Sequence, residues 1–128
     1  MSTVGFKNPT PANGATLNVD QPYTFRIGVI VDNAMAESAV VLPEVTAGEA
    51  TIEPAEAQAI DDSVLPNPDS ADWTITPTAP GTLTVVATVV EGELLVAGGA
   101  GEGSRTYTVA STATPAPARL GIGLGLGL

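Results

Sequence analysis

Residues 72–89 read DWTITPTAPGTLTVVATV, and their pattern is the strongest indication of an all-β fold in the chain. Apolar side chains alternate with threonines on both sides of Pro77–Gly81, the pattern of two β-strands that each bury one face. In the first strand Trp73 and Ile75 share a face, and in the second Leu83 and Val85 do so. The prolines and the glycine between the strands predict a corner.

Two further stretches continue this pattern. Tyr23–Val31 alternates with Phe25 and Ile27 on one face, and Ser104–Val109 places Tyr107 and Val109 together. The predicted core therefore comprises one aromatic-rich set: Trp73, Ile75, Leu83, Val85, Tyr107, Val109, Phe25 and Ile27.

Weaker segments complete the predicted strand count. An edge strand or lead-in is expected over 6–14, and short strands over 16–19, over 39–42 (ended by Pro43) and over 49–53 (ended by Pro54). Residues 55–60 fit either a strand or a single helical turn, and the glycine-rich stretch 98–103 predicts a flexible hairpin tip. With no helix long enough for a βαβ unit, we expect an all-β, immunoglobulin-like Greek-key sandwich of about seven strands.

Composition limits the classes of partner. The chain has 128 residues, 14 % of them charged, and a net charge of −10. Such a field repels nucleic-acid phosphates and anionic membrane surfaces, so neither is an expected partner. The start of the chain lacks a basic segment followed by an apolar run, so we expect no secretory signal, and the apolar run 27–31 is too short to span a membrane.

The residue inventory argues against an enzyme. The chain has no cysteine and no histidine, so thiol chemistry and a histidine base are both excluded. Asp61 and Asp62 are adjacent, would face opposite ways on a strand, and are expected to be structural or solvated. We expect no catalytic residues, no cofactor and no metal site.

Calcium is the one metal with candidate ligands. Oxygen-bearing side chains flank the strands and could gather at one end of a sandwich: Asp32, Asn33, Asp69 and Asp72. Their spacing does not match a calcium-binding loop, and a solvated acidic rim is the favoured interpretation. A calcium-dependent carbohydrate-binding sandwich remains a third, weaker functional alternative.

The composition changes after Ser111, which divides the chain into a sandwich (1–111), a Pro/Ala linker (112–119) and an anchor tail (120–128). In the tail an aliphatic residue alternates with glycine throughout, so an extended backbone places on one face Leu120, Ile122, Leu124, Leu126 and Leu128. We name residues 120–128 the tail strip. A partner would bind it by strand addition or in an apolar groove; the alternative is a tail without function.

The segments Trp73–Pro77 and Gly81–Val85 resemble bacterial and phage immunoglobulin-like (Big-type) domains. Those domains carry an aromatic-x-aliphatic-x-Pro strand, a turn that ends in glycine and a long alternating strand. The resemblance implies an immunoglobulin-like fold over about residues 4–111, without the core cysteines of antibody-type domains. Such domains occur in bacterial adhesins and in tailed-phage structural proteins, including capsid decoration proteins.

Together these observations predict a non-enzymatic structural protein of a virus particle, a phage capsid decoration or accessory protein located in the virion. Its expected partner is the major capsid protein or another virion structural protein, with further copies of itself as a second candidate. The alternative is a cell-surface or secreted adhesion module of bacterial immunoglobulin-like type.

Overall fold

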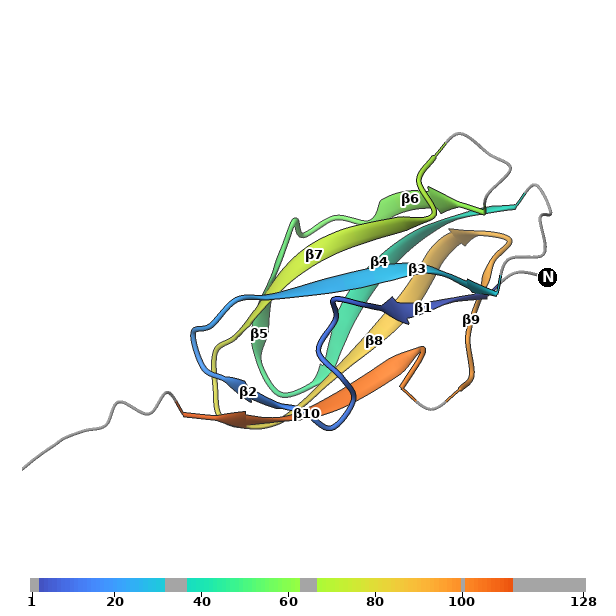
Figure 1. Cartoon of the computed structure of the whole chain (residues 1–128). Helices are drawn as coiled ribbons and strands as arrows, with labels where there is room; N and C mark the ends of the chain where they lie inside the picture. The colour runs from blue at the N-terminus through green and yellow to red at the C-terminus, as the bar shows by residue number, and fades with distance from the viewer. Residues whose placement is uncertain (1–2, 32–36, 63–66, 100, 112–128) are drawn as a thin grey trace, which may run out of the picture.

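A computed structural model of the chain describes residues 3–31, 37–62, 67–99 and 101–111, and these residues form an all-β sandwich (Figure 1). The predicted immunoglobulin-like sandwich fold is confirmed. The strands are β1 (Thr3–Lys7), β2 (Thr16–Asn18), β3 (Tyr23–Val31), β4 (Ser38–Ala47), β5 (Ala50–Glu53), β6 (Gln58–Asp61), β7 (Ser70–Pro77), β8 (Gly81–Gly92), β9 (Leu95–Val96) and β10 (Ser104–Ala110). No helix in the described residues could cross a membrane.

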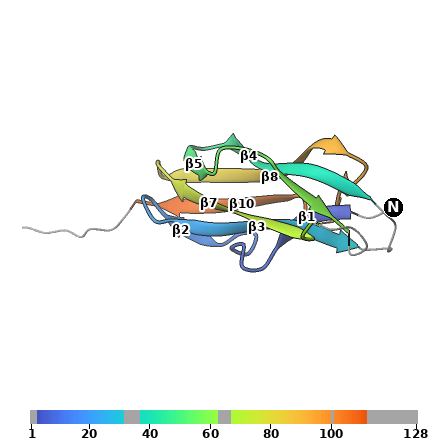
Figure 2. The ribbon, with the colours of Figure 1, turned by 90° about the horizontal axis from the view of Figure 1, so that it is seen from above.

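The strands form two five-stranded sheets, ordered β5-β7-β3-β1-β9 and β2-β10-β8-β4-β6. Figure 2 shows the elongated sandwich from above, with β4 and β8 in one layer and β3 and β7 in the other. The stretch 72–89 links the layers, because β7 belongs to the first sheet and β8 to the second. The predicted corner is confirmed, since β7 ends at Pro77 and β8 begins at Gly81.

The core lies between the sheets and is centred on aromatic side chains. Phe25 of β3 pairs with Trp73 of β7 in the strand register. The Phe25 ring also makes edge-to-face contacts with Phe6 and Tyr107, at centroid distances of 5.9 and 5.7 Å. Edge-to-face contacts of this kind add to the free energy gained by burying the rings.

The described part of the chain contains ten strands, where the sequence predicts about seven. β6 lies in the stretch that sequence could not assign, and β9 was not predicted. Leu95 and Val96 of β9 are 59 % and 38 % exposed, so β9 has no buried face to produce an alternating pattern. β9 is held instead by parallel pairing with β1.

The prediction that Pro43 ends a strand is wrong, because β4 continues to Ala47. Pro43 lies opposite Ala87 of β8, and the Ala87 N–H donates to the Gly103 carbonyl on the far side of β8 (2.9 Å). Because Ala87 bonds to the strand on its far side, it and Pro43 form a pair without mutual hydrogen bonds, and the backbone groups of both residues point away from each other's strand. A proline there costs no hydrogen bond to β8.

The prediction of a hairpin tip at 98–103 is also wrong. This stretch connects β9 in one sheet to β10 in the other, and its described residues pack against β1. The Phe6 N–H donates to the Glu102 carbonyl (2.7 Å), and the Ala97 N–H donates to the Val4 carbonyl (2.8 Å). A Cβ built on Gly103 would lie 2.5 Å from the Val96 side chain and 2.6 Å from the Ala97 carbonyl oxygen, so this glycine permits close packing beside β9, a role that local sequence does not reveal.

Candidate partner-binding site

The eight predicted core residues all lie in the interior, each at most 4 % exposed. Trp73 illustrates their role. Its indole N–H donates to the Glu56 carbonyl (3.1 Å), so its one polar atom is bonded within the domain. The ring is 1 % exposed and does not offer a surface for stacking a ligand.

The predicted partner-binding residues lie in the tail strip, outside the described residues. Of the calcium candidates, Asp32 and Asn33 also lie outside them. The described residues bring no three acidic side chains into a group that could hold a metal ion.

Asp72 forms an ion pair with Arg26. The Arg26 guanidinium donates from Nε to Asp72 Oδ1 (2.7 Å) and from Nη2 to Oδ2 (3.0 Å). These hydrogen bonds lower the pKa of Asp72, and the same contact raises the pKa of Arg26. Asp69 is exposed, and its carbonyl accepts from the Val29 N–H (2.9 Å).

Asp61 and Asp62 are buried, at 2 % and 0 % exposure, so they are not solvated. Asp61 Oδ2 accepts from the Asn67 N–H (2.9 Å), and the Asp61 N–H donates to the Pro68 carbonyl (3.0 Å). The Asp62 N–H donates to the Glu37 carbonyl (3.1 Å). These contacts fit the structural role: those of Asp61 tie the end of β6 to the segment that precedes β7, and that of Asp62 ties it to the residue that precedes β4.

Arg105 is an organising residue that sequence reasoning missed. Its guanidinium donates to the carbonyls of Gly101 (2.6 Å), Pro11 (2.9 Å) and Phe6 (3.2 Å), and it lies over the Phe6 ring. Nearby, the Tyr107 hydroxyl donates to the same Pro11 carbonyl (2.8 Å), and burial raises the pKa of Tyr107 to about 12. This cluster joins the first turn of the chain to β10, and its donors are used within the domain.

One side of the sandwich is only half closed. β6 pairs with Ser38–Val41, the first half of β4, and Gln58 Nε2 reaches across to the Asp72 carbonyl in the other sheet (2.8 Å). No described strand pairs with the outer side of Leu42–Ala47, which we name the open edge. β5 is the edge strand of the facing sheet, so both sheets end at this opening.

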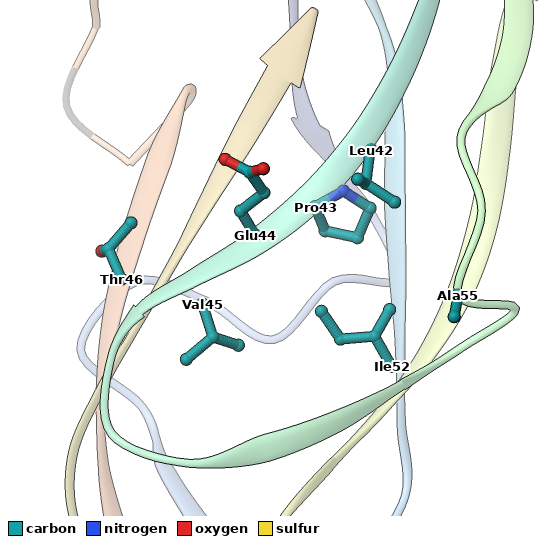
Figure 3. Close-up of a pocket in the computed structure, with 7 residues that line it drawn as sticks. All are labelled: Leu42, Pro43, Glu44, Val45, Thr46, Ile52 and Ala55. Atoms are coloured by element: carbon teal, nitrogen blue, oxygen red, sulfur yellow. The ribbon is translucent and has the colours of Figure 1, made fainter. Parts of the chain in front are cut away.

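A pocket of about 460 Å³ lies at this opening (Figure 3). It lies within the range of about 300–1,000 Å³ typical of ligand-binding pockets. Val45 and Ile52 face the space between β4 and β5, and both pack partly against the core. We name it the edge pocket, and its lining is mostly apolar: Leu42, Pro43, Glu44, Val45, Thr46, Ile52 and Ala55.

The open edge presents backbone groups as well as side chains. Val45 pairs with Val85, two residues along from the pair of Pro43 and Ala87, so it has the same orientation in the ladder. The Val45 N–H and C=O and the Pro43 C=O therefore point outward, away from β8. An added strand could form hydrogen bonds to all three groups.

Gly48 lies in the turn that connects β4 to β5, the two strands beside the edge pocket. It has φ 84°, and a Cβ built on it would lie 2.5 Å from the Thr82 carbonyl oxygen. The neighbouring Glu49 carbonyl accepts from the Thr78 N–H (3.0 Å). The turn is therefore held against the corner that joins the two sheets.

No family model and no curated protein matches this chain. Among solved structures, domains 4 and 5 of the S-layer protein SbsC match with a TM-score of 0.50 and 12 % identity, over 85 % of this chain and 52 % of theirs. The chain thus spans about half the length of that structure. A superoxide reductase (neelaredoxin) from Ignicoccus hospitalis matches with a TM-score of 0.41 and 13 % identity, over 84 % of this chain and 80 % of that one. At such identities the S-layer match shows the fold alone.

Proposed function

We propose that the chain is a non-enzymatic structural protein of a virus particle, a decoration or accessory protein bound to a phage capsid. The observation that carries this proposal is the half-closed side of the sandwich. There the open edge and the edge pocket present unpaired backbone groups beside apolar side chains.

An unpaired edge beside an apolar pocket is a site for binding a strand. Proteins ordinarily cover or blunt such an edge, because it pairs readily with other chains. Strand addition draws its affinity from backbone hydrogen bonds and its specificity from pockets for alternate side chains. The open edge offers both kinds of contact, which suits a protein that acts by being assembled with other proteins.

The resemblance of Trp73–Val85 to phage immunoglobulin-like domains supports a virus particle as the assembly. The net charge of −10 supports a protein surface over nucleic acid as the partner. The likeness to the S-layer protein SbsC bears on the fold alone and says nothing about the partner. The proposed partners are the major capsid protein or another virion structural protein, and further copies of this chain.

Fractionation of a particle-producing culture tests the proposal. An antibody against the purified chain is applied to density-gradient fractions that contain virus particles, cell envelopes or free protein. We expect the chain to band with the particles and to persist after a wash in moderate salt. Recovery with cell envelopes would overturn the proposal in favour of the adhesion-module alternative, and recovery only as free protein would overturn both.

A further inference from the structure

We propose that the edge pocket receives the tail strip of a second copy of this chain, added as a strand along the open edge. The inference deepens the proposed function, on which it rests for the idea that the chain joins an assembly. It names the partner and the surface that binds it.

The alternation of the tail strip matches the two faces of β4. Along β4, Val41, Pro43 and Val45 face the interior, while Glu44 and Thr46 are exposed on the outer face. A strand added beside Leu42–Ala47 continues the same two faces, because side chains alternate along every strand. The aliphatic residues of the tail strip would then enter the edge pocket, and its glycines would lie on the outer face.

The backbone of the tail strip also suits the open edge. Residues 120–128 include no proline, so each has an N–H to donate. The Pro43 C=O and the Val45 N–H and C=O point toward the added strand. Glycine at every second position permits close approach of the two backbones.

The direction in which the chain leaves β10 favours a second copy over the chain's own pocket. Residues 112–119 contain Pro115 and Pro117, and at about 3.1 Å per residue such a semi-rigid linker spans about 25 Å. The open edge lies only about three strand spacings of 4.8 Å from β10. Since β4 and β10 both run antiparallel to β8, the chain leaves β10 at the Gly81 end of β8 and heads away from its own open edge. An extended linker then carries the tail strip beyond its own domain, toward a second copy.

Charge around the pocket agrees with this occupant. Arg119, one of only four basic residues in the chain, immediately precedes the tail strip. Glu44 in the lining of the pocket is exposed, as are Glu49 and Glu53, which flank residues 50–52 of β5. Charges of opposite sign at the rim of an interface favour the correct docking orientation.

Disulfide trapping tests the inference directly, because the natural chain has no cysteine. Two full-length variants are mixed and oxidised, one with Ala55→Cys in the exposed lining of the edge pocket and the other with Leu124→Cys in the tail strip. We expect a disulfide between the two variants at least tenfold more abundant than in two matched mixtures. One control pairs Leu124→Cys with Ser104→Cys, at the exposed first residue of β10. The other pairs Ala55→Cys with Gly125→Cys, which would occupy the opposite face of the tail strip.

Equal yields in the three mixtures, or no disulfide in any, would overturn the inference. A chain that carries both Ala55→Cys and Leu124→Cys separates the remaining possibility. If this variant forms only intramolecular disulfide at all concentrations, the tail strip occupies its own domain and the second-copy inference fails. Trapping uses purified protein alone, so its failure leaves the particle-fractionation result standing, and the reverse also holds.

Discussion

Pro43 of β4 lies opposite Ala87 of β8 at a position where the backbone of β4 points out of the sheet, since Ala87 donates its N–H to Gly103 on the other side. This relationship explains how a proline is accommodated within a strand. It also identifies the outward groups of the open edge, because Val45 has the same orientation. Edge strands commonly carry a proline, which reduces unwanted pairing. Here the proline leaves one N–H and two carbonyls available at Pro43 and Val45.

Gly14 is a matched control for Gly48, which lies in the turn between β4 and β5. Both have positive φ, 84° and 89°, but only Gly48 would place a Cβ against backbone, at 2.5 Å from the Thr82 oxygen. We expect Gly14→Ala to lower the free energy of unfolding by about 1 kcal/mol, from backbone strain alone. Gly48→Ala should cost about 2–4 kcal/mol, because strain and steric overlap add. Urea unfolding of both variants checks this, and equal losses would contradict the close contact at Gly48.

The raised pKa of Tyr107 predicts that the folded protein loses stability at alkaline pH. Burial raises its pKa to about 12, against about 10 in the unfolded chain, so the folded state retains the proton longer. The contribution of this pKa difference to the free energy of unfolding is complete below about pH 10 and is lost as the pH rises toward about 12.

Tyr107→Phe should remove this alkaline dependence and cost about 0.5–1.5 kcal/mol near neutral pH, because the hydrogen bond to Pro11 is lost. Thermal unfolding from pH 8 to about pH 12 tests both statements. A Tyr23→Phe variant leaves Tyr107 as the sole tyrosine, so ultraviolet absorbance then reports its ionisation. Ionisation in the folded protein near pH 10 would contradict the effect of burial.

The lowered pKa of Asp72 predicts that the folded protein loses a small amount of stability in acid. Its pKa is lowered in the folded state by hydrogen bonds from Arg26, so its contribution is present above the unfolded pKa of about 3.9. That contribution is lost as the pH falls through the lower folded pKa.

We expect Asp72→Asn to unfold at a lower temperature than the natural chain at pH 7, with the difference disappearing at acid pH. The pair is solvent-exposed on both sides, so added salt should also reduce the difference. Asp69→Asn is the control, because Asp69 makes no hydrogen bond to Arg26. A difference that persists unchanged at low pH would mean that the charge of Asp72 is not its source.

Sequence alone could predict the elements whose two faces differ in burial. The corner at Pro77–Gly81 and the core positions Phe25, Trp73 and Tyr107 follow from alternation and from turn residues. Such signals exist because each of these strands has one face in the core and one in solvent.

Three features depend on long-range pairing and had no local signal. Pro43 was predicted to end a strand because proline usually interrupts strand pairing. Its outward orientation is set by the pairing with β8, which the local sequence does not show. Leu95–Val96 was missed because β9 has no buried face, and Arg105 because its acceptors lie far away in sequence, at Phe6 and Pro11. The edge pocket lies beyond Val41, the last residue of β4 that pairs with β6. Only the assembled sheets reveal where this pairing ends.

Ionic strength should strengthen association between copies. Each copy carries a net charge of −10, so copies repel one another, while the proposed contact is mainly apolar. Salt screens this repulsion, with a Debye length near 8 Å at about 0.15 M. Sedimentation at low and moderate salt should show a higher average mass in moderate salt. Leu124→Asp, which places a charge in the tail strip, should remain monomeric in both. Dissociation of the natural chain by salt would instead indicate that ion pairs hold the copies together.

Hydrogen exchange at the Val45 amide is the most direct measurement of strand addition at the open edge. This N–H points away from β8 and should exchange rapidly in dilute, monomeric protein. We expect its exchange to slow at least tenfold as the concentration of the full chain rises, and to stay fast in Leu124→Asp at every concentration. Exchange at Val45 that does not change with concentration, in samples whose average mass increases, would show that copies associate elsewhere and would contradict the proposed site.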